Sequence, residues 1–125
     1  MTVGIDTVEI KRIKELINKE RFLERVFSED EIKEFSLRNN KPEHIAAAFA
    51  GKEAFSKALG TGISGFKLTE VSLLHLENGK PYLKFSGNAL SIVNEKGLSF
   101  DVSVTHTDSL ATVIVIGFRE GKVYL

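Results

Sequence analysis

An alanine-rich segment between Pro42 and Gly60 predicts one long helix in the 125-residue chain. Proline fits the first turn of a helix, where its missing N–H would have had no partner. Glycine fits just past the last turn, because it readily adopts the left-handed conformation that ends many helices. The segment therefore predicts a helix that begins at Pro42 and stops before Gly60.

Two further helices are expected ahead of this one. Residues 9–17 carry isoleucine and leucine at helical spacing. Ser28 and Glu31 have the spacing of a capping box, in which each residue satisfies a backbone N–H of the other. That capping box opens a helix that we expect to end near Asn39-Asn40.

The second half of the chain changes to short segments typical of strands. Asn78-Gly79 lies between two of them and predicts an antiparallel hairpin with a type I′ turn. Residues 89–96 read as a short helix that Gly97 ends. The strand-like segments of this half are residues 68–76, 81–85, 100–105 and 110–118, and residues 3–7 read as a further short strand at the start of the chain. The predicted fold class is α+β, with helices mainly in the first half packed on an antiparallel sheet from the second half.

Composition limits the function classes. Seventeen Lys and Arg balance seventeen Asp and Glu, so net charge gives no support to nucleic-acid binding. No apolar run approaches the ~18 residues of a membrane span, and no secretion signal is visible. Cysteine is absent, which excludes disulfides and fits a reducing compartment. We expect a single domain over residues 1–125, located in the cytoplasm, with no nucleic-acid or membrane partner.

Asp6 is the first candidate site residue. It closes the strand-like stretch that begins at Val3 and precedes the first predicted helix. A carboxylate in this place is often the cap of the next helix. It can also bind a cation, and its local sequence leaves both interpretations open.

Glu53 is the second candidate. On the long helix it falls in a stripe that is otherwise small and apolar, so its carboxylate needs a cation. Lys57, one turn later, is one candidate, in the favourable order of Glu before Lys. Mg²⁺ is the other, because hard cations prefer one or two carboxylates together with phosphate oxygens and water. In that case Asp6 and Glu53 hold the metal, and Lys57 holds a phosphate.

His106 ends the alternating apolar face of residues 100–105 and is followed by Thr107. A histidine there is often a boundary residue, but an imidazole, a hydroxyl and turn amides also make a phosphate pocket. His44 and His75 lack such sequence neighbours and are interpreted as structural.

Two other features have weaker meaning by themselves. Gly60-Thr61-Gly62 follows a helix, whereas the glycines of nucleotide-binding loops precede one, so these glycines indicate a helix end. The absence of a Walker-type loop or kinase signature disfavours another nucleotide-dependent phosphotransferase. Residues 11–25 contain six basic and three acidic side chains and could face an acidic partner.

These pieces together resemble one family. The matching segments, in order, are Gly4-Ile5-Asp6, Phe49-Ala50-x-Lys52-Glu53-Ala54-Phe55-x-Lys57-Ala58, Gly60-Thr61-Gly62, Asn78-Gly79-Lys80-Pro81 and Ser103-Val104-Thr105-His106-Thr107. They resemble the short type of 4′-phosphopantetheinyl transferase, the holo-(acyl-carrier-protein) synthases. The resemblance runs from Val3 to about Phe118, and its specific part is Asp6 with Lys52-Glu53-x-x-x-Lys57.

The resemblance implies a Mg²⁺-dependent transfer. Coenzyme A gives its phosphopantetheine to a serine of an apo acyl carrier protein, and adenosine 3′,5′-bisphosphate leaves. Asp6 and Glu53 are implied to hold the metal against the pyrophosphate, and Lys57 to contact the phosphates and stabilise charge. His106 and Thr107 are implied to bind a phosphate across a subunit boundary, because members of this type are trimers.

The resemblance also assigns binding residues outside the metal site. Those implied near the adenosine end of coenzyme A are Gly60, Gly62, Gly79, Lys80 and Pro81. Those that match the helix receiving the acidic carrier protein are Arg12, Arg21, Phe22 and Arg25.

One departure and one alternative remain. Many relatives of this type carry an arginine where this chain has Ala48, which leaves open the cation that replaces it.

The alternative function is a non-enzymatic module that docks an acidic protein through its basic helix. Under it, Asp6 only caps a helix and Glu53 only pairs with Lys57. Binding of metal and coenzyme A distinguishes the two hypotheses.

Overall fold

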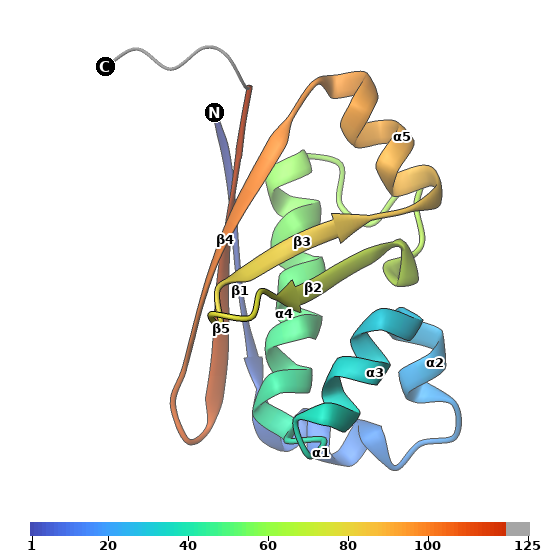
Figure 1. Cartoon of the computed structure of the whole chain (residues 1–125), viewed down its shortest axis with the longest axis vertical. Helices are drawn as coiled ribbons and strands as arrows, with labels where there is room; N and C mark the ends of the chain where they lie inside the picture. The colour runs from blue at the N-terminus through green and yellow to red at the C-terminus, as the bar shows by residue number, and fades with distance from the viewer. Residues whose placement is uncertain (120–125) are drawn as a thin grey trace.

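The computed structural model describes residues 1–119, and residues 120–125, which the single-domain prediction includes, lie outside this part (Figure 1). The helices are α1 (Ile10–Ile17), α2 (Phe22–Val26), α3 (Glu29–Leu37), α4 (Pro42–Leu59) and α5 (Gly87–Lys96), with a 3₁₀ turn η1 (Leu68–Glu70). The strands are β1 (Thr2–Glu9), β2 (Val71–His75), β3 (Pro81–Phe85), β4 (Ser99–His106) and β5 (Leu110–Phe118). The predicted α+β class is confirmed.

Local signals in the sequence fixed the helix ends correctly. The Ser28 hydroxyl accepts the N–H of Glu31 at 3.1 Å, and the Glu31 carboxylate accepts the N–H of Ser28 at 3.0 Å. Pro42 occupies the first turn of α4, and Gly60 ends this helix with a φ of 85°. These caps satisfy backbone groups that a helix end otherwise leaves without partners.

The main sheet differs from the prediction because it draws on both ends of the chain. It is antiparallel with strand order β1-β5-β4, so the N-terminal strand pairs with the last one. Asp6 stands opposite Val113, and Val113 stands opposite Val104 on the other side. The hairpin of β2 and β3 forms a second, two-stranded sheet. The expectation of one sheet from the second half of the chain is therefore wrong.

The hairpin itself also corrects two details. Gly79 has a φ of 91°, but Asn78 is not among the residues with positive φ, so the turn is not type I′. The loop is longer: Gly79 donates its N–H to Leu76, and Leu76 donates its N–H to Lys80, both at 2.9 Å. This is the pattern of a three-residue loop with a glycine bulge. Residues 68–70, expected as the start of β2, form η1 instead.

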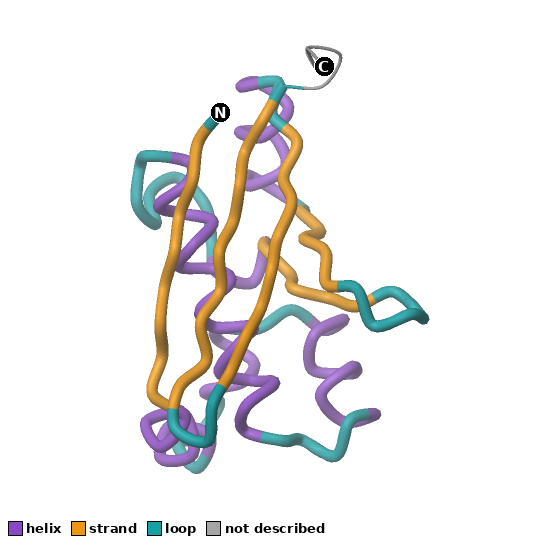
Figure 2. Tube along the Cα trace, turned by 90° about the vertical axis from the view of Figure 1, so that its left-hand side faces the viewer, coloured by secondary structure: helices purple, strands orange, loops and turns teal. Residues whose placement is uncertain are grey.

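Helix α4 covers one face of the main sheet and leaves the other face bare. A side chain at Gly4 would overlap the carbonyl oxygen of Ala54, so only glycine lets β1 lie this close to α4. The covered face is apolar and includes the fully buried Val113 and Val115. In Figure 2 the three strands face the viewer with no helix in front of them.

Candidate active site

The close contact of β1 and α4 brings together the two carboxylates and the lysine that the sequence singled out. Asp6 lies on β1, two residues after Gly4, and Glu53 and Lys57 lie one turn apart on α4. Lys57 donates hydrogen bonds to the carbonyl oxygen of Ile5 at 2.8 Å and to the Asp6 carboxylate at 3.2 Å. The three residues therefore form one cluster on the edge of the sheet that β1 provides.

This cluster overturns two of the local interpretations. Asp6 lies inside β1 and caps no helix: Glu9 is the residue before α1, and it makes no side-chain cap. Lys57 pairs with Asp6, and no ion pair joins it to Glu53 within residues 1–119. Of the two cations considered for Glu53, Lys57 is therefore the wrong one, because its ammonium group donates to the Ile5 carbonyl and the Asp6 carboxylate instead.

Glu53 lies near a second carboxylate, Asp6, whose lysine partner forms no ion pair with Glu53 within residues 1–119. Its pKa is raised above the ordinary value by partial burial and by the Asp6 carboxylate, while Lys57 and Arg12 act in the opposite direction. Two nearby carboxylates that repel each other are a favourable place for a cation. The pair alone gives too few ligands for a metal site, and residues 1–119 contain no cluster of three or more metal-binding side chains. This donor set fits a hard ion such as Mg²⁺, which takes its other ligands from phosphate and water.

A second charged pair beside this cluster was not recognised as a pair from the sequence. Lys52 is 1% exposed and donates to the Glu31 carboxylate at 2.5 Å, to the Leu68 carbonyl at 3.0 Å and to the Val71 carbonyl. Glu31 is fully buried and also accepts the N–H of Leu73 at 3.1 Å. Burial raises the pKa of Glu31 and lowers that of Lys52. The sequence predicted the capping box of Ser28 and Glu31, but it did not show that the Glu31 carboxylate also binds the Lys52 ammonium group.

Four residues predicted to bind coenzyme A line one cleft of about 450 Å³ between the hairpin and β4: Gly79, Lys80, Pro81 and His106. The same cleft is lined by Arg38, His44 and His75, so the structural interpretation of both histidines is incomplete. These residues meet through tertiary contacts, and no spacing in the sequence predicted that they would line one cleft.

Three other predicted residues lie outside this cleft. Gly60 ends α4 with a φ of 85°, and Gly62 lies two residues further along with a φ of 65°. The Thr107 hydroxyl accepts the N–H groups of Ser109 at 3.3 Å and Leu110 at 3.1 Å. Thr107 thus shapes the β4–β5 turn, and its O–H remains able to donate to an anion.

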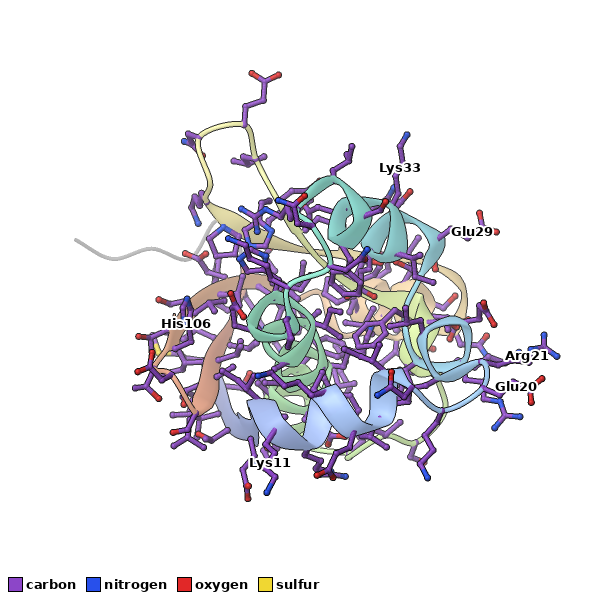
Figure 3. All side chains as sticks on the ribbon, turned by 90° about the horizontal axis from the view of Figure 1, so that it is seen from below. Lys11, Glu20, Arg21, Glu29, Lys33 and His106 are labelled. Atoms are coloured by element: carbon purple, nitrogen blue, oxygen red, sulfur yellow. The ribbon has the colours of Figure 1, made fainter. Side chains whose placement is uncertain are left out.

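The predicted partner surface is made of two helices instead of one. Arg12 lies on α1, whereas Arg21 precedes α2, and Phe22 and Arg25 belong to α2. Figure 3 shows Arg21 projecting at the opposite end of the molecule from His106. Arg12 lies 6.0 Å from the centre of the Phe49 ring, which fixes this cation near the Glu53 cluster.

Comparison with known proteins decides the family. The family model of the 4′-phosphopantetheinyl transferase superfamily matches residues 2–112. The chain belongs to this superfamily. It is 39% identical to the holo-(acyl-carrier-protein) synthase of Treponema denticola over 116 residues, which cover 91% of this chain and 94% of that protein. It is 40% identical to the synthase of Thermoanaerobacter sp. over 119 residues, covering 92% and 86%.

Solved structures of this superfamily share the fold. The holo-(acyl-carrier-protein) synthase of Neisseria meningitidis superposes with a TM-score of 0.86 at 28% identity, covering 94% of this chain and 98% of that one. The Helicobacter pylori synthase, solved in complex with coenzyme A, gives 0.81 at 31% identity, covering 93% and 99%. The resemblance read from the motifs is therefore confirmed at the level of family and fold.

Within residues 1–119, no helix is long and apolar enough to cross a membrane. Ala48, where the resemblance led us to expect an arginine, is 1% exposed and belongs to the apolar core between α4 and the sheet.

Proposed function

We propose that this chain is a holo-(acyl-carrier-protein) synthase. It transfers 4′-phosphopantetheine from coenzyme A to a serine of an apo acyl carrier protein. The serine oxygen forms a bond to the phosphorus that carries pantetheine, the P–O bond to the adenosine phosphate breaks, and the serine proton is released. The products are the holo carrier protein and adenosine 3′,5′-bisphosphate. The family assignment and the relatives named as this synthase support the proposal.

The observation that carries the mechanism is the shared cluster of Asp6, Glu53 and Lys57. We assign Asp6 and Glu53 as the ligands of Mg²⁺, which when bound would neutralise charge on the pyrophosphate. Lys57 is the cation positioned to contact the same phosphates and to stabilise the charge that grows on the leaving phosphate. Its exposed side chain and its contact with Asp6 support this role.

We assign the carrier-protein surface to α1 and α2, with Arg12, Arg21, Phe22 and Arg25 as its contacts. Arg21 supports this assignment because its side chain is 69% exposed and, within residues 1–119, forms an ion pair only with Glu24, three residues later, at 3.7 Å. An exposed pair of this kind contributes little to stability, so an acidic partner can replace it at small cost. Arg12, near Phe49 and Glu53, extends this basic surface to the catalytic cluster.

The proposal includes a homotrimer with sites between subunits. The bare face of the main sheet supports it, because Val3 and Ile5 are 59% and 54% exposed there and stand opposite Ile116 and Ile114. An uncovered apolar face of this kind favours association. The Asp6 cluster and His106 lie on β1 and β4, the two edge strands of the sheet, so a neighbouring copy can combine them into one site. A cytoplasmic location is also proposed, and the lack of cysteine fits it.

The test of the function is mass spectrometry of an apo acyl carrier protein incubated with the chain, coenzyme A and Mg²⁺. We expect a mass gain of one phosphopantetheine that depends on the metal and is lost with Glu53→Ala. Failure to modify any of several carrier proteins, by a protein that binds coenzyme A, would contradict transferase activity. Sedimentation of the free protein tests the trimer separately, with Ile5→Lys expected to shift it towards monomer.

A further inference from the structure

The segment between α4 and η1, residues 60–67, is a loop that begins beside the candidate catalytic cluster. Its first residue, Gly60, donates its N–H to the carbonyl oxygen of Lys57 at 3.1 Å. Residues 60–65 are exposed, and within residues 1–119 the N–H groups of residues 61, 62, 63 and 65 make no hydrogen bond. In Figure 1 the loop runs from the end of α4 alongside α5 to η1. A ligand held at Lys57 therefore borders a loop whose backbone donors can bind it.

The far end of the loop is held by Glu70, whose carboxylate joins two separate segments of the chain. Its Oε1 atom accepts the N–H of Lys67 at 2.8 Å, and its Oε2 atom accepts the N–H of Asn88, in the first turn of α5, at 3.0 Å. These backbone hydrogen bonds lower the pKa of Glu70 below its usual value, so the carboxylate is charged at neutral pH. Phe66 is buried against Phe55, with the ring centres 5.6 Å apart. Glu70 is thus the polar tether of this loop end, and Phe66 is the apolar one.

The fold leaves space for the Glu70 carboxylate at the start of α5. A side chain at Gly87, the first residue of α5, would overlap Glu70 Oε2. Gly87 also has a φ of 53°, which glycine adopts without strain. Ser86, the residue before α5, makes no side-chain cap, so Glu70 satisfies a backbone donor that the usual capping residue leaves open. One carboxylate therefore sets the position of the loop relative to α5.

We propose that Glu70 is a positioning residue for coenzyme A: it holds the loop of residues 60–67 against α5 and so keeps the backbone donors of the loop beside the ligand. This inference rests on the proposed function, in which Lys57 contacts the phosphates of coenzyme A. Glu70 acts through the loop and makes no contact with the ligand. Without the tether the loop spends part of its time away from the binding position, and the affinity falls by that fraction. The transfer step at Asp6 and Glu53 is unaffected.

The test uses two variants that break the same contact in different ways. Glu70→Gln leaves one acceptor oxygen and turns an NH₂ group towards the other backbone N–H, whereas Gly87→Ala pushes the carboxylate away from α5. We expect each to raise the KM for coenzyme A, and its dissociation constant in calorimetry, about threefold to tenfold, as for a loop in place a third to a tenth of the time. The value of kcat should stay unchanged. The double variant should show no more than the larger single effect, because both changes act on one contact.

Gly97→Ala is the matched control. Gly97 ends the same helix with a φ of 63°, so the substitution introduces similar backbone strain, but nothing lies within 4 Å of the added side chain. This variant should lose stability and keep the KM of the unaltered protein. Amide hydrogen exchange gives a readout that is independent of activity. Exchange at Lys67 should become faster in Glu70→Gln and Gly87→Ala, and should keep its original rate in Gly97→Ala.

Three results would overturn the inference and leave the proposed transfer intact. An unchanged KM in Glu70→Gln would show that the loop does not depend on this carboxylate. An equal rise of KM in Gly97→Ala would assign the effect to a general loss of stability. Additive effects in the double variant would show that Gly87→Ala does not act through Glu70. If the unaltered protein binds no coenzyme A, the proposed function fails and this inference fails with it.

Discussion

Lys52 and Glu53 are neighbours on α4, but their charges meet opposite surroundings. The Lys52 ammonium is buried and bonded to Glu31 and two backbone carbonyls. The Glu53 carboxylate is half-buried, faces a second carboxylate and has no ion-pair partner in residues 1–119. The first charge is fully compensated by the chain, and the second is not. A buried, satisfied pair holds elements together, whereas an unsatisfied carboxylate at the surface can take a ligand.

The difference has a geometric cause. Successive residues on a helix point about 100° apart. Lys52 therefore faces β2 and α3, the helix that carries Glu31, while Glu53 faces β1 and Asp6. Helix α4 thus contributes Lys52 to a buried structural ion pair on one side, and Glu53 and Lys57 to the candidate catalytic cluster on an adjacent side.

The largest expected effect comes from breaking the buried pair. Lys52→Met should lower the free energy of unfolding by about 3–5 kcal/mol, because it leaves the Glu31 carboxylate buried without its cation. Denaturation in urea measures the loss. The double variant Glu31→Gln/Lys52→Met should regain much of it, since no charge then remains buried. A double variant no more stable than the single one would show that the charge is not the cause.

The next effect concerns transfer activity. Glu53→Gln should reduce the rate of carrier-protein modification by about 100- to 1000-fold, the usual scale for losing one electrostatic contributor to a transition state. Its far-UV spectrum should match that of the unaltered protein. Glu95→Gln, an exposed change on α5, is the matched control and should keep full activity. Equal activity of the two variants would remove Glu53 from the mechanism.

Metal binding separates the two regions directly. At a Mg²⁺ concentration a hundredfold above its dissociation constant, the folded protein should gain about 2.7 kcal/mol. Glu53→Gln should lose most of this gain, whereas Glu31→Gln/Lys52→Met should keep it. Thermal unfolding with and without a chelator measures both. Stabilisation of Glu53→Gln equal to that of the unaltered protein would place the metal elsewhere.

The smallest effect is a pH dependence in metal-free protein. Because the pKa of Glu53 is raised above 4.5 in the folded state, the folded chain binds this proton more tightly than the unfolded chain. The resulting stabilisation is present below pH 4.5 and is lost as the pH rises through the folded pKa. Glu53→Gln lacks this loss, so it should become more stable than the unaltered protein by roughly a few tenths of a kcal/mol near neutral pH. Denaturation curves at pH 4 and pH 7 check this, and an equal difference in stability between the two proteins at both pH values would show that the folded chain does not raise the pKa of Glu53.

The sequence by itself determined the features that depend on one or two turns of chain. Ser28 with Glu31 marked the start of α3, and Pro42 and Gly60 marked the two ends of α4, because a cap or a fixed φ acts on backbone groups a few residues away. The motif around Asp6, Glu53 and Lys57 also predicted the candidate catalytic cluster, and the family comparison supports the resemblance on which that prediction rested.

Only the tertiary structure decided which distant groups meet. The pairing of β1 with β5, the bond between Glu31 and Lys52, and the gathering of Arg38 and His44 beside His106 join residues that lie far apart in the chain. No periodicity or spacing encodes such partners. They follow from how buried faces pack and from the need of each buried charge or polar atom for a partner, which depends on the whole fold.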